Sequence, residues 1–223
     1  MGLNTMLQRL TKLATIGVIL SIASTAASAG SIRVTVLDRE GEPVPDIAVY
    51  AGGAGPNPAP SGTSAVMDQV DQRFVPHLLV VQTGTSVEFP NSDTVAHHVY
   101  SFSHPNHFKL PIYKGHAHPP VTFDESGLVV LGCNIHDHML AFILVVDTPA
   151  FSTTNDNGVA MLAGRSDEYT TVSIWSPRIR DGSENLSVMI EASDFESAVT
   201  FNLIKPLRAP HHEQSGVLSW TDY

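Results

Sequence analysis

Cysteine is almost absent from this sequence of 223 residues, which contains only Cys133. A single cysteine cannot form an intramolecular disulfide, so a disulfide-bonded scaffold is excluded. Basic residues are also scarce, with 12 Lys and Arg against 22 Asp and Glu, and the net charge is −10. A protein that binds the nucleic-acid backbone carries the opposite sign, so we exclude that class and expect no nucleic-acid partner.

Long apolar runs are confined to the N-terminus. Residues 13–23 are largely apolar, follow the basic residues Arg9 and Lys12, and precede the small residues Ala27, Ser28 and Ala29. This order predicts a signal peptide over residues 1–29 that is cleaved after Ala29, and its apolar run is too short for a comfortable membrane span. We therefore predict an exported, periplasmic protein without a membrane span. In an oxidising compartment, a lone cysteine is a reactive thiol, an intermolecular bridge or a protected metal ligand.

Helical periodicity is also missing, whereas short alternating or apolar runs recur between Gly- and Pro-containing turns. Such runs are typical of β-strands, so we predict an all-β chain. We expect a β-sandwich over residues 30–148 and a smaller β-sandwich-like module with a polar tail over residues 149–223. The predicted strands are residues 31–37, 47–49, 74–81, 86–89, 98–102, 121–123, 128–131, 140–146, 159–162, 169–175, 186–191 and 200–204.

The clearest chemical motif surrounds the one cysteine. Cys133 is followed by His136 and then by Met139, and this segment joins two of the predicted strands. Soft sulfur ligands together with imidazole favour copper or zinc, and two imidazoles, one thiolate and a weak thioether describe a blue-copper site. The segment supplies one imidazole of that set, so a second must come from another part of the chain.

The best source of a second imidazole is the His97–His98 pair within residues 91–99. Neighbours on a strand point to opposite faces, so only one of the two can face the metal. His138, between His136 and Met139, is a competing ligand. The connection over residues 103–120 holds further histidines that could bind a second metal ion, although their spacing fits no defined site. These are His104, His107, His116 and His118.

The Cys133-x2-His136-x2-Met139 spacing, together with Asn91 and His97 on an alternating β background, resembles the cupredoxins. The short ligand segment is similar to that of amicyanin, and residues 84–93 with His97 are similar to the strand and loop that supply the first histidine in plastocyanin-like proteins. Asn134 to Asp137 and Trp175 to Arg178 also resemble bacterial exported proteins named methylamine utilization proteins. The cupredoxin resemblance covers residues 31–147.

The resemblance implies a Greek-key β-sandwich with one type 1 copper ion at one end. It implies that His97, Cys133 and His136 are the equatorial ligands and that Met139 is the weak axial ligand. One departure is His98, because many cupredoxins have an asparagine there that braces the ligand loop. A different residue at this position alters the surroundings of the metal and hence its redox potential.

We therefore expect a protein that carries single electrons between periplasmic partners through transient docking, with His136 and Ile135 near the exchange surface. One alternative is a periplasmic copper carrier or buffer, and a second is a β-sandwich interaction module that binds no metal. We expect no enzyme, since no pair of carboxylates or nucleophile–base motif indicates catalysis. Substrate access to an open axial position would be the exception.

Overall fold

The computed structural model confirms the all-β prediction. It describes residues 30–53, 57, 59–115, 118–164, 168–180, 186–191, 194 and 198–209. Strands dominate this part of the chain, and one short 3₁₀ helix covers His104–Asn106. The expected signal peptide, His116 and the C-terminal tail from residue 210 lie outside the described residues. No helix in the described ranges is both long and apolar enough to span a membrane.

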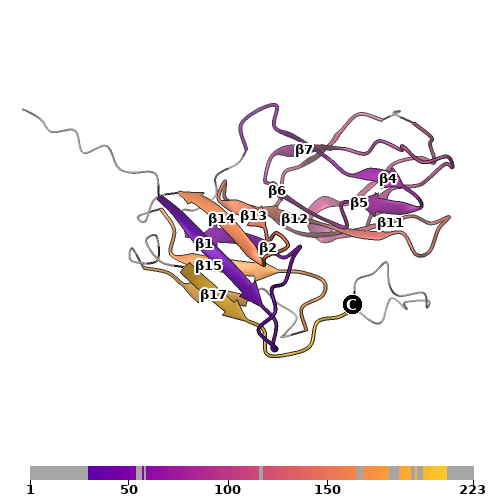
Figure 1. Ribbon diagram of the computed structural model, residues 1–223. Coiled ribbons are helices and arrows are strands. Elements are labelled where there is room, and N and C mark those ends of the chain that lie inside the picture. Colours follow the sequence, from indigo (N-terminus) through magenta and orange to yellow (C-terminus); the bar gives the residue numbers. More distant parts are fainter. Residues whose placement is uncertain are drawn as a thin grey trace, which may run out of the picture.

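The described residues form four sheets and one hairpin (Figure 1). The first sheet has the order β14 (Val159–Gly164), β1 (Gly30–Leu37) and β17 (Ala198–Asn202). The second is β13 (Phe151–Thr153), β2 (Ala48–Gly52), β15 (Thr171–Trp175) and β16 (Leu186–Met189). The third is β6 (Leu78–Gln82), β12 (Leu140–Val146), β11 (Gly127–Gly132), β8 (Tyr100–Ser101) and β9 (Phe108–Lys109). The fourth is β10 (Val121–Phe123), β7 (Thr85–Glu88) and β3 (Ser64–Val66). Strand β4 (Asp68–Val70) forms a hairpin with β5 (Arg73–Val75), and its Gln69 makes an isolated bridge to Asn91.

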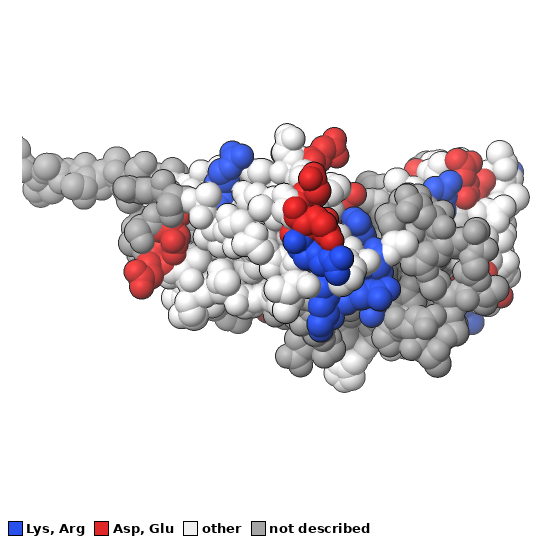
Figure 2. Space-filling view, turned by 60° about the horizontal axis from the view of Figure 1, so that its bottom comes forward, with Lys and Arg blue, Asp and Glu red and all other residues white. Residues whose placement is uncertain are grey.

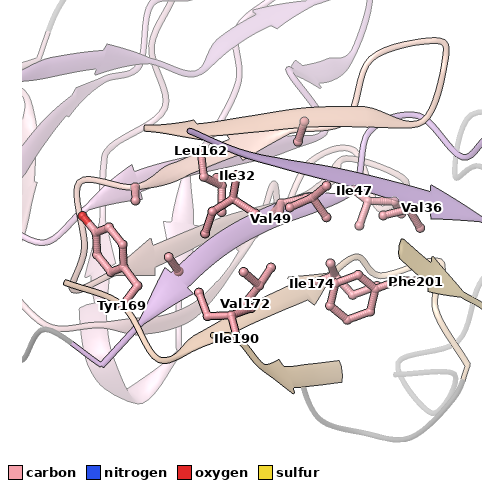
Figure 3. Close-up of a cluster of buried hydrophobic side chains, with 14 of the residues drawn as sticks. Ile32, Val36, Ile47, Val49, Leu162, Tyr169, Val172, Ile174, Ile190 and Phe201 are labelled. Carbon is pink, nitrogen blue, oxygen red and sulfur yellow. The ribbon is translucent and has the colours of Figure 1, made fainter. Parts of the chain in front are cut away.

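Three clusters of hydrophobic side chains are packed between the sheets. The first lies between the β14–β1–β17 and β13–β2–β15–β16 sheets and includes Ile32, Val49, Val172 and Phe201 (Figure 3). The alternation of β1 sends Ile32, Val34 and Val36 into this cluster, as its half-buried pattern predicts. A second cluster joins the sheets that contain β12 and β7, and it includes Cys133 and Met139. The two candidate sulfur ligands are therefore anchored in a packed core.

The third cluster joins the two sandwiches. Leu144 and Val146 of β12 pack with Ala48, and Tyr50, Phe151 and Trp175 of the second sheet pack against them. The rings of Phe142 and Trp175 lie 5.6 Å apart between centroids in an edge-on arrangement. All seven residues of β12 are buried, because this strand has a hydrophobic cluster on each face. Burial on both faces accounts for its continuous apolar sequence.

The strand pairing groups the chain differently from the division expected at residue 148. Strand β1 is antiparallel to β14 and parallel to β17, and β2 pairs with β13 and β15. Residues 30–52 thus lie with the C-terminal strands, whereas the sequence pattern had placed them with residues 53–148. An alternating pattern shows which face of a strand is buried, but it does not identify the strand's partner.

The predicted strand over residues 74–81 is divided between two sheets. Phe74 belongs to the β4–β5 hairpin, while Leu78 begins β6, which pairs in parallel with β12. The chain turns from Asn155 to Gly158 between β13 and β14, which lie in different sheets. This turn is therefore a corner between sheets rather than the turn of a two-stranded hairpin.

Candidate metal centre

The cysteine loop is held at both ends by the antiparallel pair β11 and β12. Gly132 and Leu140 face each other in this ladder, and the Met139 N–H donates to the His136 carbonyl at 2.9 Å. A Cβ added at Gly132 would lie 2.8 Å from the Tyr100 ring, so a side chain there would collide with the ring unless the ring moved. Glycine at this position lets Tyr100 cover the backbone next to Cys133. The loop that carries the sulfur is thus fixed by paired strands.

His97 comes from the loop before β8 and is fixed by its backbone. Its N–H donates to the Tyr113 carbonyl and its carbonyl accepts from the Tyr113 N–H, each at 3.0 Å. The Asn91 side chain donates to the carbonyls of Val95 and Tyr113, at 3.0 and 2.9 Å, and so ties the loop to the same segment. The His97 side chain is fully buried. Two segments that are distant in sequence therefore hold this imidazole beside the cysteine loop.

Three donor atoms meet between these loops. The Nδ1 atoms of His97 and His136 are 3.0 Å apart, and Cys133 Sγ lies 3.8 Å from His136 Nδ1. The ligand atoms of the three residues all lie within 4.8 Å of one another. Donors that share one first-row metal ion lie about 2.0–2.3 Å from it, and hence no more than roughly 4.6 Å apart. The spacing of the three donors therefore fits a single ion to within a few tenths of an ångström.

Asp93 fixes the proton on His97. Its Oδ2 lies 2.9 Å from His97 Nε2, on the opposite side of the ring from the shared donor centre. Because an ionised carboxylate only accepts hydrogen bonds, Nε2 is the protonated nitrogen and Nδ1 presents its lone pair. A hydrogen bond from the Gln72 N–H and a second from His97 hold the pKa of Asp93 well below its usual range.

His98 does not join the donor group. Its side chain is also buried, but its ring lies against Tyr100, with 5.3 Å between the centroids. Its contribution to the centre comes from the backbone, since the His98 N–H donates to Cys133 Sγ at 3.4 Å. Burial lowers the pKa of the His98 side chain, which favours a neutral ring in this position. Of the two adjacent histidines, His97 is the one whose imidazole lies with the donors.

The other histidines named from the sequence lie apart from the three donors. His138 is exposed, and its ring centroid is 6.2 Å from that of His136. His104, His107 and His118 belong to no cluster of three possible ligands within the described ranges. Met139 is buried and packs in the same cluster as Cys133, at the end of the ligand loop. Its role as the axial ligand stays a prediction.

One side of the centre is open to solvent at the cysteine loop. His136 is partly exposed, whereas His97 and Cys133 are buried, and Ile135 next to it is 44% exposed. Partial burial lowers the pKa of His136, and the nearby His97 and His138 rings act in the same direction. A neutral imidazole is the form that binds a metal. The edge of His136, bordered by an exposed aliphatic side chain, is thus the accessible part of this centre.

Sequence reasoning missed three contributors to the site. Asp93 contributes its carboxylate to His97, and Gln72 contributes its backbone N–H to Asp93. Tyr113 contributes two backbone hydrogen bonds to His97. A hint was available for Asp93, because a nearby carboxylate is a common partner for the second nitrogen of a ligating histidine. Gln72 and Tyr113 contribute through the main chain, so no side-chain motif marks them.

A second surface feature lies on the segments that follow β15 and β17. Four basic residues are gathered by hydrogen bonds from Arg208 Nη1 to Pro177 O at 2.9 Å, from Lys205 Nζ to Arg180 O at 3.1 Å, and from Arg178 Nε to Arg208 O at 3.4 Å. Figure 2 shows Lys and Arg side chains gathered beside a group of Asp and Glu on the face turned forward. The acidic net charge is therefore distributed unevenly over the molecule.

Comparison with known proteins yields no match to a protein-family model and none to a curated protein. Among solved structures, the chain is similar to amicyanin from Paracoccus versutus, at 16% identity and a TM-score of 0.34, over 44% of this chain and 97% of that one. It is also similar to a purple cupredoxin from Nitrosopumilus maritimus, at 19% identity and a TM-score of 0.32, over 38% of this chain and 99% of that one. For a copper-containing nitrite reductase from Thermus scotoductus, the identity is 22% and the TM-score 0.36, over 51% of this chain and 28% of that one. Overall similarities this low do not assign a function. The chemistry and spacing of the donor atoms are therefore the basis for inferring one.

Proposed function

We propose that this protein is a type 1 copper protein that carries single electrons. The observation that supports this most directly is the convergence of two imidazole Nδ1 atoms and one buried thiol, at 3.0 and 3.8 Å, without a carboxylate among the donors. A donor set of two imidazoles and one thiolate favours copper over the hard cations, which prefer oxygen. A copper ion, when bound, supplies a one-electron couple, and the chain supplies its ligands and its surroundings.

Different residues would hold the copper ion, influence its redox potential and keep its geometry constant. His97, Cys133 and His136 would hold the ion, and Met139 is proposed as the axial ligand because it closes the same loop. The His98 N–H at Cys133 Sγ would withdraw charge from the sulfur and so influence the potential. The antiparallel strands that fix both ends of the cysteine loop favour similar geometry in both oxidation states, as rapid electron exchange needs.

The proposal extends to a partner and a compartment. The exposed edge of His136 beside Ile135 would be the exchange surface for a redox protein, which would dock weakly over a small area. The predicted signal peptide supports export to the periplasm, and the association with methylamine utilization stays a prediction that rests on the sequence resemblance. Export also accounts for a lone cysteine that is buried and close to two imidazoles.

The proposal is tested by visible spectroscopy during titration of the metal-free protein with Cu(II). We expect an intense thiolate-to-copper band that saturates at one equivalent, disappears in Cys133→Ser, and persists in the matched control His138→Ala. A weak band that survives Cys133→Ser would refute the type 1 site, because it would show adventitious binding by histidines. A blue protein that passes copper rapidly to an acceptor chelator and shows no reversible potential would instead be a carrier or buffer.

A further inference from the structure

We propose that the β4–β5 hairpin positions His97, acting through Asp93. The inference rests on the proposed function for the identity of the metal, but the orientation of the imidazole is a property of the chain alone. In the described part of the chain the hairpin belongs to none of the four larger sheets, and an isolated parallel bridge joins its Gln69 to Asn91 in the loop before His97. Its contacts with the loop that carries His97 are what connect it to the candidate centre.

The turn of the hairpin has an unusual backbone. Asp71 and Gln72 lie between Val70 and Arg73 and both have positive φ, at 50° and 56°. Two consecutive positive φ values characterise a type I′ turn, which suits the twist of a two-residue hairpin but is unfavourable for residues other than Gly, Asn and Asp. In this conformation the Gln72 N–H donates to Asp93 Oδ2 at 2.7 Å. The turn thus adopts an unfavourable conformation in which the Gln72 N–H points at the Asp93 carboxylate.

The Asp93 carboxylate relays this contact to the imidazole. The same Oδ2 that accepts from Gln72 lies 2.9 Å from His97 Nε2, while Oδ1 accepts from the Thr94 N–H at 2.6 Å. Donors on three sides leave the carboxylate one orientation. The Asp93 side chain is 7% exposed and His97 is fully buried, so solvent screens this arrangement little. The hairpin thus determines which nitrogen of His97 carries the proton and where Nδ1 points.

Two further contacts join the hairpin to the same loop. Asp68 accepts from the backbone N–H and the hydroxyl of Ser92, at 3.2 and 2.8 Å. The buried side chain of Gln69 donates to the Pro90 carbonyl at 2.8 Å. The hairpin therefore contacts the loop at residues 90, 92 and 93, immediately before the imidazole. Contacts at three points restrict translation and rotation of the loop as well as the orientation of one side chain.

The first test observes His97 without any metal. Two-dimensional ¹⁵N NMR of the imidazole rings in the metal-free protein, at a pH where histidine is neutral, should show His97 as a single tautomer protonated on Nε2. In Asp93→Ala we expect a mixture of tautomers. Asp71→Asn is the matched control, because it removes a neighbouring carboxylate while asparagine tolerates a positive φ. Gln72→Gly is a second control that keeps the N–H and relieves the turn.

The second test measures Cu(I) affinity by competition with a chelator. Removing the partner of a ligating histidine typically weakens metal binding about 10–100-fold, so we expect this loss in Asp93→Ala and less than about threefold change in either control. Gln72→Val, which strains the turn, should shift affinity in the same direction as Asp93→Ala but less. The Cu(I) affinity of Asp93→Asn should lie between those of wild type and Asp93→Ala, because the amide oxygen can still accept a hydrogen bond from His97. If Asp93→Ala does not fold, the affinity of Asp93→Asn serves as the test.

An Asp93→Ala variant that retains one tautomer and wild-type affinity would overturn the inference. So would an Asp71→Asn variant that matches the losses of Asp93→Ala, since the effect would then come from charge rather than from the hydrogen bond. The two proposals fail separately. A tautomer change without a blue copper band would refute only the electron-carrier function, and a blue band with an unchanged tautomer would refute only the positioning role.

Discussion

Gly132 offers a sharp test of how the cysteine loop is fixed. A Cβ at this position would lie 2.8 Å from Cζ and from the hydroxyl oxygen of Tyr100. Carbon atoms normally approach to about 3.5–4.0 Å, so the ring or the strand must move by roughly 1 Å. Forced overpacking of this kind costs about 1–3 kcal/mol. We therefore expect Gly132→Ala to lower the free energy of unfolding by that amount, measured by chemical denaturation.

A double-mutant cycle with Tyr100→Ala isolates the clash. Gly132 lies within strand β11 and has no positive φ, so alanine is compatible with its backbone. Once the ring is removed, Gly132→Ala should be neutral or slightly stabilising, because alanine reduces the entropy of the unfolded chain. The coupling between the two positions should therefore be about 1–3 kcal/mol. An equal cost of Gly132→Ala in both backgrounds would refute the argument that ring contact excludes a side chain here.

Three further predictions follow from the packing and the candidate centre. Trp175→Ala removes a side chain from the cluster between the two sandwiches and should lower the free energy of unfolding by about 2–4 kcal/mol, measured by thermal unfolding. Met189→Ala, at a 76% exposed position, should change that free energy by less than about 0.5 kcal/mol. Equal effects of the two substitutions would contradict the packing described for Trp175. Burial raises the pKa of Tyr113 from 10.0 to about 12, so the stability from its neutral phenol is complete below pH 10 and lost as the pH rises towards 12, and the ultraviolet titration of Tyr113→Phe should lack this late ionisation. Copper at a free concentration 100 times its dissociation constant should stabilise the protein by about 2.7 kcal/mol in calorimetry, and Cys133→Ser should abolish this gain.

The local patterns of the sequence were sufficient for most strands. Residues 31–37 alternate and residues 140–146 are continuously apolar, and both form strands. The spacing from Cys133 to His136 also predicted two donors that the structure brings together. Two residues that are three positions apart in one loop cannot lie far from each other. The pattern failed where Pro76 lies, because a run of apolar residues does not show that its two halves join different sheets.

The sequence by itself determined the strand class, the apolar faces and the donor chemistry of the cysteine loop. Each of these depends on residue type and short-range spacing, which the chain fixes locally. Only the tertiary structure decided that β1 joins the C-terminal strands, that the imidazole of His97 rather than that of His98 lies with the other two donors, and that the Gln72 N–H contacts Asp93. These outcomes depend on which distant segments pack together, and pairing across many residues is set by the burial of whole faces and the satisfaction of backbone groups.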